Sequence, residues 1–158
     1  MNLDLLNSAT AFVWAEADLL DHAEYAAWLD LWTPDGLYVV PIDPDTEDFA
    51  NTLNYANDDA DMRARRVARL ASGESVSTQP RARTVRNVSR LRILRGDAGA
   101  VTLRGAQDLR DFRKGCFHQH TADVTWDLVR NGDTWRIRRK VVRLINSIDT
   151  LSTVGYVL

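Results

Sequence analysis

The second half of this 158-residue chain alternates apolar and polar side chains over unusually long segments. The alternation runs through residues 84–94, 100–112, 117–129 and 134–146, and a period of two is typical of a β-strand. Asn131 and Gly132 give a strong hairpin signal between the last two segments. Strands of about 11 to 13 residues exceed the usual length. Because such strands curve, the pattern predicts a meander that bends into a cone, with other elements on its concave side.

Residues 16–41 predict elements that fill this concave side. Asp21 is expected to cap a short helix, with Glu24 at the capping-box spacing behind it. The apolar stripe of that helix, at positions i, i+3, i+4 and i+7, consists of Tyr25, Trp28, Leu29 and Trp32. Residues 33–36 (TPDG) predict a turn, because proline presets φ and glycine can take a positive φ. A short strand is expected over residues 37–40.

The region between the first strand and the meander holds a loop and a third helix. Residues 42–56 are acidic and aperiodic, so we expect a loop that covers something. A helix is expected from about Asp58 to Ser72, with acidic side chains in its first turn and arginines behind them. We therefore predict one α+β domain over residues 1–158. It is a half-barrel with a strongly curved, antiparallel or mixed sheet and about three helices on the concave side.

Acidic and basic side chains are separated along the sequence. Residues 1–61 carry 14 Asp and Glu and no Lys or Arg, whereas residues 62–158 carry 20 basic and 8 acidic side chains. A basic segment can bind nucleic acid, but we prefer an acidic helical layer packed beside a basic sheet, with no nucleic-acid partner. Eighteen of the basic residues are arginine, which suits interfacial ion pairs. An arginine-rich sheet face that meets an acidic partner subunit therefore stays open.

Composition excludes several classes of protein. No segment approaches the ~20 apolar residues of a membrane span, and residues 1–6 lack the basic region of a signal peptide. Cys116 is the single cysteine, which excludes an internal disulfide and suits a reducing compartment. It also excludes a metal centre that takes two thiolates from this chain. We expect a cytoplasmic protein with no membrane partner.

Several motifs carry a family resemblance. They are EADLLDHAEYAAWLDLWTPDGLYVVP, YANDDADMRARRVARL, QPRARTVRNVSRLRI, WRIRRKVVRLIN and the apolar end GYVL. These motifs resemble the small (β) subunit of aromatic-ring-hydroxylating dioxygenases. The element order resembles the NTF2-like or SnoaL-like cone fold, which also holds scytalone dehydratase and ketosteroid isomerase. The matches follow in order over nearly the whole chain, although the N-terminus is shorter than in many β subunits.

The resemblance implies a scaffold subunit whose activity belongs to a larger enzyme. In that family the large (α) subunit holds a Rieske [2Fe–2S] cluster and a mononuclear Fe(II), and it adds both atoms of O2 to an arene with NAD(P)H-derived electrons. The implied partners are the α subunit, in an α3β3 hexamer with β–β contacts, and indirectly a ferredoxin and reductase. No catalytic, cofactor-binding or metal-binding residue is then expected on this chain. A Rieske centre needs two cysteines and two histidines, and this chain has one cysteine.

His118 and His120 are the residues most like a metal-binding pair. They lie two apart on an expected strand, so both side chains project from one face. A two-His-one-carboxylate iron site needs an acid beside them, and Asp123 would fall on the opposite face. We therefore expect ordinary strand histidines and no metal.

The main alternative is a stand-alone SnoaL-like or ketosteroid-isomerase-like isomerase, dehydratase or cyclase. Such an enzyme would use an acid or base in the cone cavity, where desolvation shifts its pKa. The candidates for that role are Asp18, Tyr38, His118 and His120, with Trp126 and Trp135 as walls. We favour the interpretation that aromatic side chains fill the cavity. A third class, a non-catalytic NTF2-like binding module for an unrelated partner, ranks last.

The start of the first long strand supplies candidates for a partner interface. Arg81, Arg83 and Arg86 either form ion pairs with another subunit or are solvated surface, and the sequence leaves both open. Lys140 matches a recurrent polar position of the family motif, for which we expect a structural role. The apolar residues 151–158 are expected to dock on their own sheet or on a neighbour.

Overall fold

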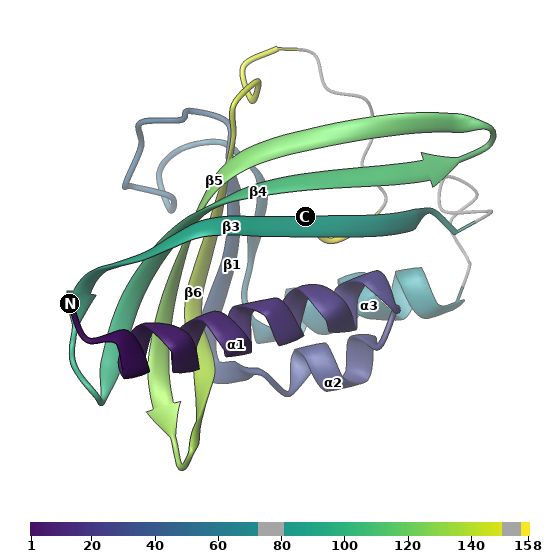
Figure 1. The fold of residues 1–158 in the computed structure, drawn as a ribbon. Coiled ribbons are helices and arrows are strands. Elements are labelled where there is room, and N and C mark those ends of the chain that lie inside the picture. Colours follow the sequence, from purple (N-terminus) through teal and green to yellow (C-terminus); the bar gives the residue numbers. More distant parts are fainter. Residues whose placement is uncertain (73–80, 150–155) are drawn as a thin grey trace.

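The computed structural model describes residues 1–72, 81–149 and 156–158, and these residues form three helices and six strands. In chain order the elements are α1 (Leu3–Asp21), α2 (Tyr25–Leu29), β1 (Trp32–Pro41), β2 (Asn54–Asp58), α3 (Ala60–Ser72), β3 (Arg83–Gly96), β4 (Ala100–Arg113), β5 (Cys116–Asn131) and β6 (Thr134–Leu144). Figure 1 shows a strongly curved sheet with α1 lying across its open side. The predicted α+β half-barrel is confirmed.

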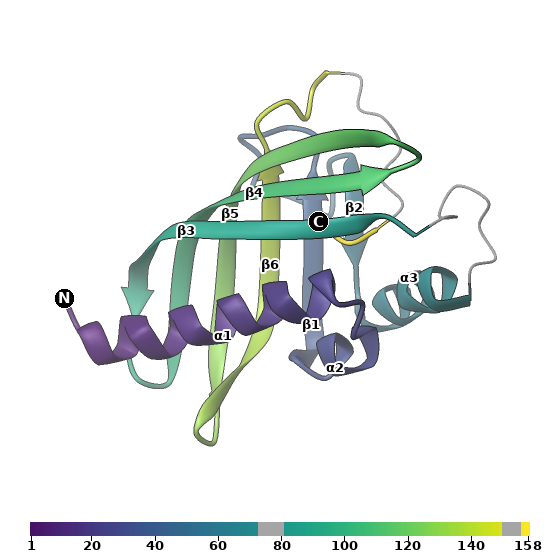
Figure 2. The same ribbon diagram turned by 45° about the vertical axis from the view of Figure 1, so that its right-hand side comes forward.

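The six strands form one sheet in the order β2–β1–β6–β5–β4–β3. β1 pairs in parallel with β6, so that Tyr38 lies opposite Lys140, and all other neighbours are antiparallel. The pairing of β5 with β6 begins only at Ala122. The first part of β5 therefore continues past β6 together with β4 and β3, and Figure 2 shows these strands bending into an arm above α1.

A bulge in β3 marks the bend of this arm. Arg90 has a φ of 54°, and the register between β3 and β4 shifts between Ser89 and Arg92. Gly105 of β4 lies against the bulge, where a Cβ would be 2.7 Å from Leu91 Cδ2 and 3.0 Å from the Ser89 carbonyl oxygen. A side chain at Gly105 would push the strands apart, because bulges and glycines are what let a sheet bend this sharply.

The core lies between α1 and the concave face of the sheet. The buried helix residues are Leu5, Ala9, Phe12, Val13 and Leu20, and they pack in one cluster with sheet residues such as Leu103, Leu109, Val124, Leu128 and Ile137. No helix within the three described ranges is both long enough and apolar enough to cross a membrane.

The loop between β1 and β2 covers part of the convex face, as its acidic and aperiodic sequence predicts. Phe49 packs against Val39 and Val141 in a small separate core. Arg143 of β6 donates hydrogen bonds to the Thr46 carbonyl oxygen at 2.9 Å and to Glu47 Oε1 at 2.7 Å. The loop is shorter than expected, because residues 54–58 form β2.

Two local predictions are wrong. Asp21 does not cap α2 but ends α1, where its carboxylate accepts hydrogen bonds at 2.9 Å from Thr84 Oγ1 and from the Arg86 backbone amide. Residues 33–36 lie inside β1 as an irregularity in its pairing with β6, and Trp32 opens that strand. In both places a contact with the distant sheet outcompetes a local capping or turn preference, which is worth only about 1 kcal/mol.

Trp28 anchors α2 in the core. Its side chain is fully buried and makes edge-to-face contacts with Trp32 and Tyr38. We expect Trp28→Ala to lower the free energy of unfolding by about 3–5 kcal/mol, the range for large core truncations. Trp14 is 57% exposed, so Trp14→Ala is a matched control that should cost about 1 kcal/mol or less. Equal midpoints for the two variants in urea denaturation would contradict this placement of α2.

Candidate functional site

The centre of the cone holds a buried carboxylate, that of Glu16 in α1. Its Oε1 accepts hydrogen bonds from Lys140 Nζ at 2.8 Å and from Trp28 Nε1 at 3.1 Å, and its Oε2 accepts one from Trp126 Nε1 at 3.0 Å. None of these four residues is more than 1% exposed. One side chain therefore joins α1, α2, β5 and β6.

The Glu16–Lys140 pair is enclosed too completely for acid–base chemistry. Burial lowers the pKa of the Lys140 ammonium, and the neighbouring Glu16 carboxylate opposes that shift. A buried lysine with a lowered pKa can act as a base, but this Nζ is bonded to Glu16 and lies 5.8 Å from the centre of the Trp126 ring. A substrate could reach it only after the core had repacked. The geometry suits the structural role expected for Lys140.

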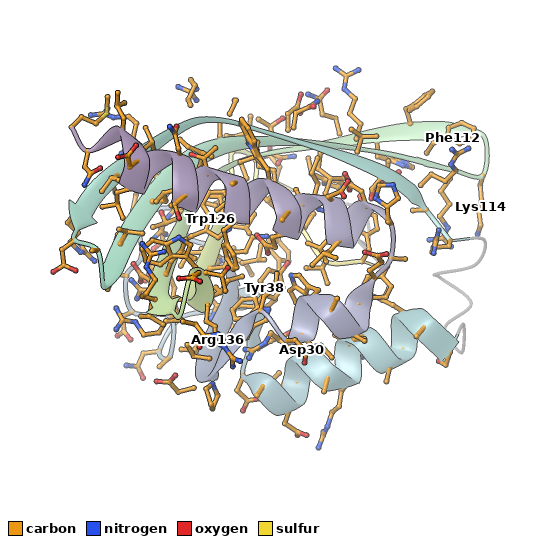
Figure 3. The ribbon with its side chains drawn as sticks, turned by 60° about the horizontal axis from the view of Figure 1, so that its bottom comes forward. Asp30, Tyr38, Phe112, Lys114, Trp126 and Arg136 are labelled. Carbon is orange, nitrogen blue, oxygen red and sulfur yellow. The ribbon has the colours of Figure 1, made fainter. Side chains whose placement is uncertain are left out.

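Tyr38 lies in the same interior, where Figure 3 shows it with Trp126 inside the curve of the sheet. The Tyr38 hydroxyl oxygen accepts a hydrogen bond from the Leu158 backbone amide at 2.9 Å. Burial raises the pKa of Tyr38 to about 12, so the phenol stays neutral at physiological pH. Tyr38 therefore stabilises the end of the chain and has little capacity as a base.

The end of the chain closes the mouth of the cone. Val157 and Leu158 are buried, and the Tyr156 hydroxyl donates a hydrogen bond to Asp111 Oδ2. Residues 156–158 thus dock on the chain's own sheet, as expected for the apolar tail. Residues 151–155 of that tail lie outside the described ranges.

A small cavity remains between the end of α1 and the tail. It measures about 30 Å³ and is lined by residues that include Leu20, Asp21, Arg86, Tyr156 and Val157. This volume has room for water but is far below the roughly 150 Å³ of an engineered apolar cavity that binds benzene. An aromatic substrate does not fit this space.

Arg86 holds the mouth of the cone together from inside. Its guanidinium donates hydrogen bonds to Asp21 Oδ1 and to the Val157 carbonyl oxygen, and its side chain is only 2% exposed. This position revises the expectation that Arg86 faces a partner, because Asp21 of the same chain already neutralises its charge. Arg81 and Arg83 are exposed, and for them a partner interface stays a prediction.

A second ionisable cluster surrounds Asp111 at the rim of the cone. Asp111 Oδ1 lies 2.8 Å from His118 Nδ1, and Asp111 Oδ2 lies 3.7 Å from His120 Nε2. Burial lowers the pKa of His120 and so favours its neutral form, while Asp111 opposes the shift. Burial and Asp111 both raise the pKa of Tyr156. The cluster keeps a neutral phenol bonded to a carboxylate and so fixes the tail.

Asp111 is the residue that sequence reasoning missed. The signal that could have found it is the tight turn at Lys114 and Gly115, because a hairpin with that turn sets Asp111 of β4 opposite His118 of β5.

Asp123 is exposed and lines a groove on the outer face of the sheet, away from the histidines, as expected. Across the part of the chain that the structure describes, no three His, Cys, Asp or Glu side chains are placed to hold a metal ion.

The four residues named for a cone enzyme do not converge. Asp18 lies on the exposed side of α1, 3.3 Å from His22, so it does not line the interior and that expectation is corrected. Tyr38 and His120 are buried on different strands, and the side chain of His118 is 46% exposed at the rim.

Trp126 and Trp135, named as cavity walls, are both core residues. Neither is more than 2% exposed, and Trp135 Nε1 donates a hydrogen bond to Ser8 Oγ at 3.1 Å. The aromatic side chains fill the space that a substrate would need.

Comparison with known proteins adds independent information. The family model described as "Ring hydroxylating beta subunit" matches residues 15–150. The anthranilate 1,2-dioxygenase small subunit of Acinetobacter baylyi is 27% identical over 159 residues, covering 92% of this chain and 93% of the relative. The β subunit of the benzoate 1,2-dioxygenase from Burkholderia mallei is similar with a TM-score of 0.76 at 25% identity, over 96% of each chain. An NTF2-like protein with a cystatin-like fold from Novosphingobium aromaticivorans shares the fold, with a TM-score of 0.63 at 17% identity, over 91% of this chain and 84% of that one.

The buried ion pair predicts a non-additive mutational effect. Removing one partner of such a pair costs about 3–5 kcal/mol, whereas removing both charges is often nearly neutral. We expect Lys140→Met to destabilise the protein by that amount, because it leaves the Glu16 carboxylate without its cation. The double variant Glu16→Gln/Lys140→Met should recover part of the loss, because it removes the unpaired charge while the amide oxygen still accepts a hydrogen bond from one of the two indole N–H groups. Denaturation curves of the two variants test this, and a double variant no more stable than the single one would speak against the pair.

Arg86→Met should also destabilise the isolated chain. It removes the cation that neutralises Asp21 and the side-chain donor to the Val157 carbonyl oxygen, at a cost of about 3 kcal/mol. Arg83→Met is the matched control on the same strand, and because Arg83 is exposed it should stay within about 0.5 kcal/mol of wild type. Thermal unfolding of both variants measures the contrast. If Arg86→Met unfolds like Arg83→Met, the tail is not held by Arg86.

Proposed function

Because the chain belongs to the ring-hydroxylating β-subunit family, we propose that it is the structural small subunit of an aromatic-ring dioxygenase whose chemistry takes place on a large subunit. The observation that carries the proposal is the filled cone. Glu16, Lys140 and the tail residues Val157 and Leu158 occupy the interior in which a cone-shaped enzyme would hold its substrate. A subunit that supports another chain can use this whole space as hydrophobic core.

The redox groups of the proposed enzyme are assigned to the large subunit. A Rieske [2Fe–2S] cluster takes two cysteines and two histidines, and the single cysteine of this chain, Cys116, is exposed at the start of β5. His118 is hydrogen-bonded to Asp111, and His120 is buried beside it. These residues fit neither a Rieske cluster nor a mononuclear iron site. When present on the large subunit, the two iron groups supply electron transfer and O2 activation.

The proposed reaction is the addition of both atoms of O2 to an arene with electrons derived from NAD(P)H. The product is a cis-dihydrodiol or, from an aminated ring that then loses ammonia, a catechol. The anthranilate and benzoate dioxygenases named above are enzymes of aromatic acids, which supports an arene as the substrate class. The cavity inside the described part of the cone, at about 30 Å³, is too small for an arene, so we assign the choice of arene to the large subunit.

We assign the whole of residues 1–158 to one domain within a hetero-oligomer. Small subunits of dioxygenases pair with large subunits, and the proposed assembly is an α3β3 hexamer with β–β contacts. A ferredoxin and reductase would deliver electrons to the large subunit and touch this chain only indirectly. The exposed free thiol of Cys116 is compatible with a reducing cytoplasm.

One observation favours a second candidate, a stand-alone isomerase or dehydratase. Asp111, His120 and Tyr156 bring three ionisable groups together at the mouth of the cone, and such clusters occur at catalytic sites. The tail already uses this cluster, and the neighbouring cavity of about 30 Å³ is too small for a ring substrate. This candidate therefore ranks second.

Co-expression decides between the two candidates. With the large subunit encoded beside it, the small subunit should elute as one hetero-oligomer near equal stoichiometry, and the large subunit should gain soluble yield or turnover. Iron should be found with the large subunit, and the small subunit purified alone should carry none in stoichiometric amount. A small subunit that ignores the large one and isomerises or dehydrates a small ketone by itself would overturn the proposal.

A further inference from the structure

We propose, on the basis of the function above, that the outer face of the β3–β4–β5 arm is the surface on which the large subunit docks. The surface, called here the arm surface, consists of Arg83, Val85, Arg110, Phe112 and Phe117. It lies at the turn end of the β4–β5 hairpin, where Figure 3 labels Phe112 beside Lys114 of the turn.

Strand register places the five side chains on one face. Arg83, Phe112 and Phe117 are direct neighbours across the three strands. Val85 lies opposite Arg110, two residues further along β3 and β4, and therefore on the same face. Side chains alternate between the two faces of a strand. The intervening row, which contains Asp111 and His118, points into the mouth of the cone and contacts the tail.

The apolar members of the arm surface are unusually exposed. Phe117 is 76% exposed, Val85 60% and Phe112 42%, and the two phenyl rings lie with centroids 4.9 Å apart. Burying them in a complex would remove this apolar area from water, which is the main driving force for association. Contiguous exposed apolar groups of this kind mark interaction sites, and aromatic residues with arginine dominate the energetics of protein interfaces.

The charged members of the arm surface lack carboxylate partners. Among the residues that the structure describes, neither Arg83 nor Arg110 forms an ion pair, whereas Arg86, Arg139 and Arg143 are all paired within the chain. The nearest carboxylate on the same face of β4, that of Asp108, accepts hydrogen bonds from Gln119 and Thr121. The arm surface therefore offers unpaired positive charge beside two aromatic rings.

These features define the chemistry of the partner. It must present carboxylates around an apolar recess. The carboxylates would pair with the guanidinium groups, and the recess would bury the phenyl rings. A two-fold contact between copies of this chain would instead place Arg83 and Arg110 of one copy opposite the arginines of the other, because such a contact joins identical patches. The large subunit is therefore the occupant to which we commit.

The inner side of the hairpin holds the arm surface in place before binding. Asp111 bonds to His118 across the hairpin and to Tyr156 of the tail. Fixing a surface in advance reduces the ordering cost of association. This arrangement explains why an ionisable cluster without a substrate pocket lies directly behind the exposed rings.

Matched variants test the proposal in the full chain. Phe117→Asp and Arg110→Glu should each weaken binding to the large subunit roughly tenfold or more, as at an interface hot spot. The controls are Leu53→Asp, whose side chain is 80% exposed at the far end of the sheet, and Arg69→Glu on the exposed side of α3. Both controls should stay within about twofold of wild type, as for surface positions outside an interface. The melting temperatures of the four isolated variants should match, which separates binding from folding.

The single cysteine gives a second readout. Cys116 is exposed and directly precedes Phe117, so a docked large subunit should slow its alkylation by N-ethylmaleimide at least about tenfold, as for a group buried in an interface. Mass spectrometry of the Cys116 peptide measures the rate without interference from thiols of the large subunit. A Cys116→Ser/Ala64→Cys variant, with its thiol on α3, should react at the same rate free and bound.

The outcomes separate this proposal from the function on which it rests. If all four variants bind the large subunit like wild type and Cys116 stays reactive, the arm surface is not the docking site although the small-subunit function stands. If Phe117→Asp and Arg110→Glu abolish only self-association of the isolated chain, the occupant is a second copy and the proposal is overturned. If the wild-type chain does not bind the large subunit at all, the proposed function and the docking site both fail.

Discussion

The Glu16 carboxylate is the point on which the rest of this structure depends. It binds Trp28, Trp126 and Lys140 from three different elements, and a buried charge is tolerated only when its hydrogen bonds are satisfied. That requirement ties α1 to α2, β5 and β6 and turns Trp28 of α2 inward. The same requirement fills the centre of the cone. The interior of the described cone is thus taken up by core side chains, which is the basis of the supporting role proposed above.

Part of the uneven distribution of charge along the sequence is neutralised by ion pairs within the chain. Five ion pairs among the described residues join the acidic first part of the chain to the later basic part, namely Glu16–Lys140, Asp21–Arg86, Glu47–Arg143, Asp58–Arg66 and Asp61–Arg65. This agrees with an acidic helical layer beside a basic sheet. Among the described residues, Arg83 and Arg110 stand outside this network, as do Arg92, Arg95 and Arg104 of the same strands. The first interpretation describes Arg86, and the partner interface stays a proposal for Arg83 and Arg110.

Long-range periodicity was readable from the sequence, and single side-chain contacts were not. The four alternating segments predict β3 to β6 because a period of two depends only on which face of the sheet is buried. Asp21 has the spacing of a cap, yet it pairs with Arg86, which lies 65 residues away in the sequence. Asp111 was not predicted for a related reason, because the register of the β4–β5 hairpin, and not a sequence motif, places it beside His118. The filling of the cone by residues 156–158 depends on tertiary packing that no local pattern encodes.

The parallel pairing of β1 with β6 also affects how the protein is synthesised. Tyr38 lies opposite Lys140, so β1 leaves the ribosome about 100 residues before the strand beside which it belongs. Until then Glu16 has no ammonium partner, and the aromatic face of α2 and β1 has no complete sheet to cover it. Contacts so distant in sequence make folding slow and leave apolar surface exposed meanwhile. The nascent chain is thus expected to need chaperone protection until translation has passed β6. A large subunit is expected to bind only after this chain has folded.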